Sequence, residues 1–129
     1  MKNLFNVKIL FIYCTAIVFI TISGSCKKNG IGGSGSLSGL VKHHAKPIPN
    51  AVVYIKYGAS EFPGADVSLY DDHSTSNGDA HYEINNLRKG DYYLYGVGFD
   101  YSINQKVTGG IGVSLGNKES KSVDVPVTE

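Results

Sequence analysis

The chain has 129 residues, of which 12 are Lys or Arg and 11 are Asp or Glu, and its formal net charge is +1. This length suits one domain. Residues 1–25 contain two lysines and no acid, so the remainder carries 10 basic against 11 acidic residues. A near-neutral domain has no basic surface of the kind that binds phosphate backbones, which excludes a nucleic-acid partner.

The first 25 residues have the composition of a signal peptide. Lys2 and Lys8 flank the start of the chain, and residues 9–22 are an unbroken run of apolar, small or hydroxyl side chains. As a helix this run would span about 21 Å, which is shorter than the roughly 30 Å hydrocarbon core of a bilayer. The run therefore predicts a secretory leader in preference to a membrane-spanning helix.

Small residues at 23–25 lead directly into Cys26, which two lysines follow. This arrangement resembles the lipobox of bacterial lipoproteins, and the Cys-Lys-Lys continuation looks like that of Bacteroidetes lipoproteins, although Ser23 stands where the commonest pattern has Leu. The resemblance implies cleavage before Cys26 and acyl chains on its thiol and its amine. An ordinary secreted protein with a free cysteine and an uncleaved anchor helix are the alternatives. Cys14 would leave with the leader, so no disulfide would remain in the domain.

The sequence divides into a leader at 1–25, a tether at 26–36 and a domain at 37–129. The tether is rich in Gly and Ser and has the composition of a flexible coil. Residues 30–35 match the dinucleotide fingerprint Gly-x-Gly-x-x-Gly, but this fingerprint requires a strand before it and a helix after it. We therefore interpret these glycines as linker.

From Leu37 onward apolar residues recur with period two, and no stretch has a sustained helical period. Residues 71–79 form a polar loop that contains Asn77-Gly78, a strong turn signal. Seven short strands in about a hundred residues predict an all-β, antiparallel β-sandwich, with a closed barrel as the runner-up. The expected strands are 37–41, 50–57, 67–70, 80–84, 91–99, 106–115 and 121–127.

Five short motifs follow one another in the domain: Gly39-Leu40-Val41, Pro47-Ile48-Pro49-Asn50-Ala51-Val52-Val53, Asn77-Gly78, Tyr82-Glu83-Ile84-Asn85-Asn86-Leu87 and Gly90-Asp91-Tyr92-Tyr93-Leu94. Their order resembles that of carboxypeptidase regulatory-like domains, which are similar to transthyretin (prealbumin) and to the B-type repeats of collagen adhesins. The resemblance covers residues 36–129 and implies one seven-stranded sandwich with Tyr92 and Leu94 pointing into its core. The spacing from Gly78 to Tyr82 is longer than in the family, which leaves the register there open.

The enzymes related to this family have signatures that this chain lacks. Zinc carboxypeptidases need His-x-x-Glu, and none of the four histidines has Glu three residues later. Hydroxyisourate hydrolases of transthyretin fold end in Tyr-Arg-Gly-Ser, where this sequence has Val-Pro-Val-Thr-Glu. We therefore expect no enzyme activity, no catalytic residue and no cofactor, and keep a small transthyretin-like hydrolase as a minor alternative.

Several potential metal ligands fall in polar connections, where such residues are expected in any case. Their spacing matches no zinc or calcium site, so we expect solvated loops and retain a cation site only as an alternative. The candidates are His43, His44, Asp71, Asp72 and His73, with Asp79 and His81 nearby.

If Tyr92 and Leu94 point inward, then Tyr93 and Tyr95 point outward, and Tyr54 on the second expected strand shares this phase. These three tyrosines form a candidate ligand-binding surface, because exposed aromatic rings stack on sugars or anchor protein partners. The alternative is that they are ordinary cross-strand pairs or are covered by a loop.

The sequence as a whole predicts a non-enzymatic outer-membrane lipoprotein of the bacterial cell envelope, anchored through Cys26 and facing the periplasm. Its sandwich would serve as a binding or structural module with a protein or glycan partner. A glycan-binding accessory of a polysaccharide uptake system is the second hypothesis.

Overall fold

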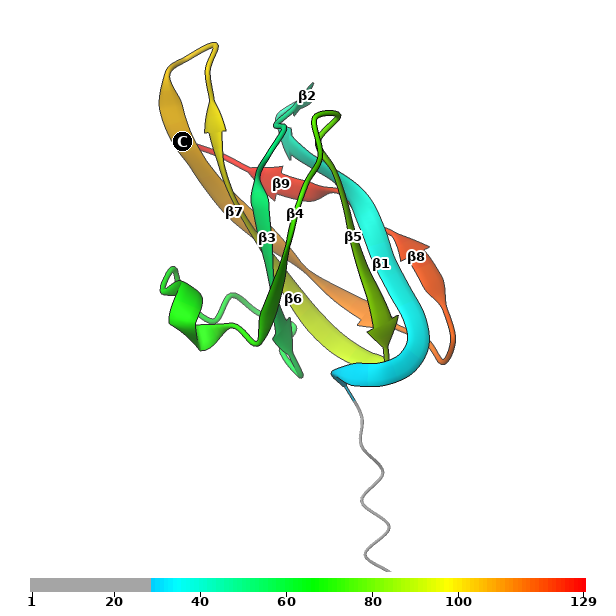
Figure 1. Cartoon of the computed structure of the whole chain (residues 1–129). Helices are drawn as coiled ribbons and strands as arrows, with labels where there is room; N and C mark the ends of the chain where they lie inside the picture. The colour runs from blue at the N-terminus through cyan, green and yellow to red at the C-terminus, as the bar shows by residue number, and fades with distance from the viewer. Residues whose placement is uncertain (1–28) are drawn as a thin grey trace, which may run out of the picture.

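The computed structural model describes residues 29–129; the leader and Cys26 lie outside the described residues. The described chain forms two facing sheets, which confirms the all-β sandwich (Figure 1). It contains no helix of the length and hydrophobicity needed to cross a bilayer. Its elements are β1 (Ile31–His43), β2 (Lys46–Pro47), β3 (Val52–Tyr57), the 3-10 turn η1 (Val67–Leu69), β4 (Asp72–Thr75), β5 (His81–Leu87), β6 (Gly90–Asp100), β7 (Gln105–Leu115), β8 (Ser120–Ser122) and β9 (Val125–Val127).

The first sheet is built around the long strand β1. Strand β5 pairs antiparallel along one side of β1, and β2 folds back on its end as a short hairpin. Strands β8 and β9 pair parallel with its other side. Gly39 of β1 lies against the segment that connects β8 to β9. A Cβ atom on Gly39 would stand 2.1 Å from the Val123 carbonyl oxygen of that segment. Only glycine allows this close approach.

The second sheet has the order β4-β3-β6-β7, and all of its pairs are antiparallel. Strands β6 and β7 form its longest ladder, from Gly90 opposite Leu115 to Asp100 opposite Gln105. At one edge two backbone hydrogen bonds of 2.8 and 2.9 Å join Thr108 to Thr128 and so connect β7 with the end of the first sheet. Apart from this bridge the sheets stay separate, as in a sandwich.

The core lies between the sheets and follows the period-two pattern of the sequence. The inward orientation expected for Tyr92 and Leu94 is confirmed, since both are fully buried. Tyr82 and Ile84 on β5 point inward as well and are no more than 8% exposed. The largest fully buried side chains are Tyr82, Tyr92, Leu37, Ile48, Ile55, Leu87, Leu94, Val41, Val53, Val107, Val125 and Val127.

Some expected boundaries were wrong. The strand expected at residues 67–70 is absent, and Val67–Leu69 form η1. Asp66 caps this turn by accepting the Ser68 N–H, and the side chains of Val67 and Leu69 are exposed. The predicted polar loop contains strand β4, whose side chains are mostly solvated, so it lacks the apolar alternation that marks a half-buried strand. Strand β1 begins at Ile31, so residues 31–36 are strand and not tether, and residues 121–127 contain parts of two short strands.

The Asn77-Gly78 turn links β4 of one sheet to β5 of the other and is therefore not a hairpin turn. The Asn77 side chain accepts the N–H groups of Asp79 and His81, and the positive φ falls on Ala80 (65°). The sequence left the strand register between Gly78 and Tyr82 open, and in the structure Tyr82 pairs with Gly39 of β1.

The two ends of the sandwich differ in what they contain. Strand β1 starts at the end where β6 also starts, and both strands finish at the other end (Figure 1). The β1–β2 turn, the β6–β7 turn and Glu129 lie together at that other end, which we call the distal end. An eleven-residue strand spans roughly 35 Å, so the distal end is far from the point where the described chain begins.

The Tyr92 hydroxyl holds the first residues of β1 against the β5–β6 turn. It accepts a hydrogen bond from the Gly30 N–H at 2.9 Å and donates one to the Arg88 carbonyl oxygen at 2.6 Å. The ring itself is fully buried and packs edge-on against Tyr57. Tyr92 therefore fills the core with its ring and caps a turn with its hydroxyl.

Tyr92→Phe should lower the free energy of unfolding by about 1–3 kcal/mol, because it leaves the buried Gly30 N–H without its partner. Urea denaturation measures the difference. Tyr101→Phe is the matched control, since Tyr101 is 82% exposed and should lose almost nothing. Equal stability of Tyr92→Phe and the unchanged protein would contradict the assignment.

Candidate functional site

The predicted tyrosine surface lies on the expected side of the sheet, away from the core, but it is not exposed to solvent. Tyr93 and Tyr95 face away from the core, and yet they are only 9% and 5% exposed. Residues 58–71 fold over them: Tyr70 stacks on Tyr95 with ring centroids 5.5 Å apart, and Phe62 contacts both rings. Tyr54, Tyr93 and Tyr95 therefore belong to a small second core under a loop, which is the alternative given for them above, and they do not form an open binding face.

Glycines on β7 make room for this covering loop. A Cβ atom at Gly112 would lie 2.2 Å from the Ser60 carbonyl oxygen, and one at Gly110 would lie 2.7 Å from the Tyr93 ring. Burial raises the pKa of the Tyr70 hydroxyl to about 12, and this hydroxyl donates to the Gly64 carbonyl oxygen. The arrangement stabilises the loop and keeps the rings of Tyr93 and Tyr95 covered.

The predicted metal candidates separate into two groups. Asp71 accepts the Tyr57 N–H at 2.8 Å and pairs with Lys56, so it has a structural role beside β3. Asp72 and His73 lie on β4, in the second sheet. His43 and His44 lie instead at the distal end, where β1 turns into β2.

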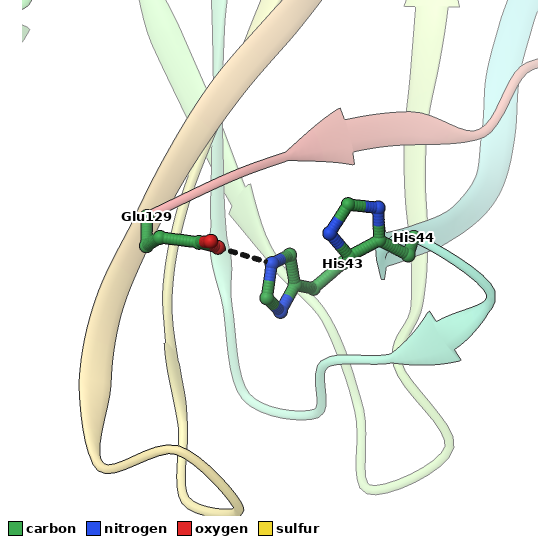
Figure 2. Close-up of side chains that lie close together, drawn as sticks. All are labelled: His43, His44 and Glu129. Atoms are coloured by element: carbon green, nitrogen blue, oxygen red, sulfur yellow. Dashed lines mark hydrogen bonds and ion pairs between the residues drawn. The ribbon is translucent and has the colours of Figure 1, made fainter.

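At the distal end a buried ion-pair network joins three parts of the chain. Asp100, at the end of β6, is 2% exposed. Its carboxylate accepts hydrogen bonds from His43 Nδ1 at 2.9 Å, from Lys46 Nζ at 2.8 Å and from the Ser102 N–H and hydroxyl at 2.9 and 2.6 Å. His43 Nε2 lies 2.6 Å from Glu129 Oε2. Figure 2 shows this contact and the His44 ring beside it.

The two carboxylates fix the protonation state of His43. Ionised carboxylates only accept hydrogen bonds, so they favour the imidazolium form of His43, in which both ring nitrogens donate, at pH values below its raised pKa. The hydrogen bond to Asp100 raises the pKa of His43 against the opposing effect of burial, and the bond to Glu129 raises it further. In return, the bonds from His43, Lys46 and Ser102 hold the pKa of Asp100 far below its ordinary range.

This network is not a catalytic triad. The Ser102 hydroxyl donates to Asp100, while His43 Nε2 faces Glu129. Ser102 therefore lacks the histidine base of a triad, and its partner Asp100 is a weak base because its pKa lies far below the ordinary range.

Beside the network lies an exposed apolar platform on the β6–β7 hairpin. Tyr101 is 82% exposed and meets Phe99 edge-on, with ring centroids 4.8 Å apart. Ile103 on the same hairpin is 43% exposed. A shallow cleft of about 470 Å³ runs between the two turns, and a smaller one of about 190 Å³ continues beneath Phe99 and Tyr101. Both clefts include Lys46 and Asp100 in their walls.

Sequence reasoning found His43 and His44 but not the rest of this site. Asp100 and Tyr101 sit in a run of polar and aromatic residues between two predicted strands, which is a hairpin signal that was available. Glu129 is 86 residues from His43, and no local pattern connects them.

No family model matches the chain, and no curated protein matches it. Among solved structures, it is similar to a "putative carbohydrate binding protein" from Pseudomonas aeruginosa, with a TM-score of 0.51 and 12% sequence identity over 76% of this chain and 91% of that chain. The likeness shows the fold, a β-sandwich. The finer resemblance to carboxypeptidase regulatory-like domains stays a prediction.

The ion-pair network should make the free energy of unfolding depend on pH. The measurement is made in EDTA so that no metal ion is bound. The pKa of His43 in the folded protein is raised above 6.5. The stabilisation that protonated His43 provides is therefore complete below about pH 6.5 and is lost as pH rises through the raised pKa. The lowered pKa of Asp100 acts on the acid side: its contribution is present above about pH 4 and is lost as pH falls through the folded value. The free energy of unfolding should therefore decline as pH rises above about 6.5.

His43→Gln should flatten this decline, because the variant has no imidazolium to deprotonate. Urea denaturation at several pH values measures it. Glu129 and Asp100 each lose a bond to His43 in this variant, but their lowered pKa values act on the acid side, so the comparison is made above about pH 6.5. The other three histidines are present in both proteins. Parallel pH profiles for the two proteins would contradict the charge assigned to His43.

Proposed function

We propose that the protein is a non-enzymatic, lipid-anchored envelope protein whose β-sandwich binds carbohydrate at the distal end. The observation that carries the proposal is the exposed Tyr101 ring beside the cleft that Lys46, Asp100 and Ser102 line. A sugar offers an apolar C–H face together with hydroxyl groups. A site with one aromatic platform and a few polar groups matches both.

The platform is held in position by its neighbours. Phe99 supports the Tyr101 ring from one side at an interplanar angle of 61°. The hairpin turn that carries Tyr101 is fixed by the Asp100 bonds to Ser102. Binding therefore orders few new side chains, and this limits the entropic cost of association.

Polar groups with unused hydrogen-bonding capacity surround the cleft. The Lys46 ammonium has three donors and is half exposed, and one donor is used by Asp100. Glu129 does not line the cleft, but it lies half exposed beside His43 and has spare acceptor positions. Sugar hydroxyls both donate and accept, so they suit this mixture. The Pseudomonas aeruginosa protein of similar fold is described as a "putative carbohydrate binding protein", which agrees with the same class of ligand.

The position of the site agrees with attachment through the N-terminus. The described chain enters the sandwich at the end opposite the distal cleft (Figure 1). A lipid on Cys26 would hold that entry end near the bilayer and leave the cleft facing away from it. We expect the anchored protein on the periplasmic face of the outer membrane.

Oligosaccharide binding tests the proposed ligand. A soluble chain from residue 27 onward, applied to cello-, xylo-, malto- and chito-oligosaccharides, should bind at least one series. Tyr101→Ala should weaken it roughly three- to tenfold, the equivalent of about 0.5–1.5 kcal/mol for one aromatic contact. Phe62→Ala is the control, because Phe62 is an exposed aromatic residue of the covering loop. Equal loss in both variants, or binding that Tyr101→Ala leaves intact, would overturn the assignment.

Metabolic labelling with a palmitate analogue tests the anchor. The full-length chain should take up the label, and Cys26→Ala should abolish it, because the acyl chains require the Cys26 thiol and amine. Cys14→Ala is the matched control and should be labelled normally. Labelling of Cys26→Ala at the level of the unchanged protein would contradict lipidation.

A further inference from the structure

Two histidines and a carboxylate converge at the distal end. His43, His44 and Glu129 each offer one ligand atom, and these atoms all lie within 4.8 Å of one another (Figure 2). Around tetrahedral zinc, with bonds of about 2.0–2.1 Å, ligand atoms stand about 3.4 Å apart. His44 and Glu129 are exposed, so their side chains can move by the remaining distance, on the order of 1 Å, without disturbing the core.

The backbone brings the two rings to the same side. Consecutive residues of a strand point to opposite faces, yet the ring centroids of His43 and His44 are 4.6 Å apart. The reason is the turn at the end of β1, where His44 has φ of 55°. Few residues other than glycine adopt this backbone conformation. It ends the alternation of side chains along β1, so the His44 ring lies on the same side as the His43 ring.

Asp100 supplies an independent observation. It is buried and its Oδ2 lies 2.9 Å from Nδ1 of His43, which directs Nε2 toward Glu129 at 2.6 Å. Metal-bound histidines almost always have such a partner on their second nitrogen, which fixes the ring and strengthens it as a ligand. The ring of His43 is therefore already oriented for coordination through Nε2.

We propose that His43, His44 and Glu129 bind a divalent transition-metal ion of the zinc type, with Asp100 positioning His43 and water completing the coordination. Two imidazoles and one carboxylate are a known set for three-ligand zinc sites. Calcium and magnesium prefer all-oxygen ligands, so this set selects against them. The proposal goes beyond carbohydrate binding and does not depend on it.

The surroundings allow the ion to enter and do not repel it strongly. The site opens to solvent through the cleft that His43 and His44 line. Lys46, the other cation of the network, is paired with Asp100 at 2.8 Å, so its charge is compensated. The ion takes the place of the hydrogen that lies between His43 Nε2 and Glu129 when no metal is bound.

Calorimetric titration of the full-length, metal-stripped protein with Zn²⁺ at about pH 7.5 tests the proposal. One ion per chain should bind with an affinity in the micromolar range, which corresponds to about 8 kcal/mol. His44→Ala and Glu129→Gln should each weaken binding at least tenfold. Both residues are exposed, so both variants should fold. Replacing zinc by Co²⁺ should give the intense visible absorption of a four-coordinate site.

His73→Ala is the matched control: this histidine is exposed on β4, and its loss should leave the titration unchanged. Asp100→Asn should weaken binding by roughly 10–100-fold without removing a ligand, and circular dichroism checks that it folds. If it does not fold, His44→Ala decides the question. Failure to saturate below about 1 mM Zn²⁺, or the same affinity in His44→Ala and the unchanged protein, would overturn the proposal.

Discussion

The organisation of the distal end depends on one buried carboxylate. Asp100 accepts hydrogen bonds from His43 and Lys46 on either side of the β1–β2 turn and from Ser102 in the β6–β7 hairpin, so it ties both sheets together at this end. A buried charge is costly unless it is fully paired, and here each carboxylate oxygen has a cationic partner. The same bonds set the orientation of His43 and the position of Tyr101. The Asp100 carboxylate therefore both organises the candidate site and holds the two sheets together at the distal end.

Local patterns predicted the core well and the surface badly. The inward faces of β5 and β6 follow from strict alternation around Tyr82, Tyr92 and Leu94, because burial on one side of a strand imposes period two. The outward phase of Tyr93 and Tyr95 was also correct. Their burial under Phe62 and Tyr70 was not predictable, since it depends on how residues 58–71 fold back over the sheet. Likewise, Glu129 reaches His43 only because β9 runs parallel to β1, a pairing between distant segments that no short motif encodes.

The aromatic residues of this chain consequently have two different roles. Those between β6 and the covering loop bury one another and stabilise the second sheet. Phe99 and Tyr101, beyond them on the same hairpin, remain exposed beside charged groups. Exposed apolar patches rimmed by polar groups often mark binding sites, whereas the covered tyrosines are accounted for by their packing. The proposed carbohydrate cleft and the proposed metal ligands both lie on this distal end, opposite the start of the sandwich.

The central claim is that ligands bind at the distal end and not on the tyrosine face. A ¹H–¹⁵N correlation spectrum of the domain, recorded while the oligosaccharide panel is added, locates the contact directly. The account predicts that shift changes concentrate in the backbone amides of residues 43–46 and 99–104. Changes that concentrate in residues 58–75, or a spectrum that no member of the panel alters, would contradict it.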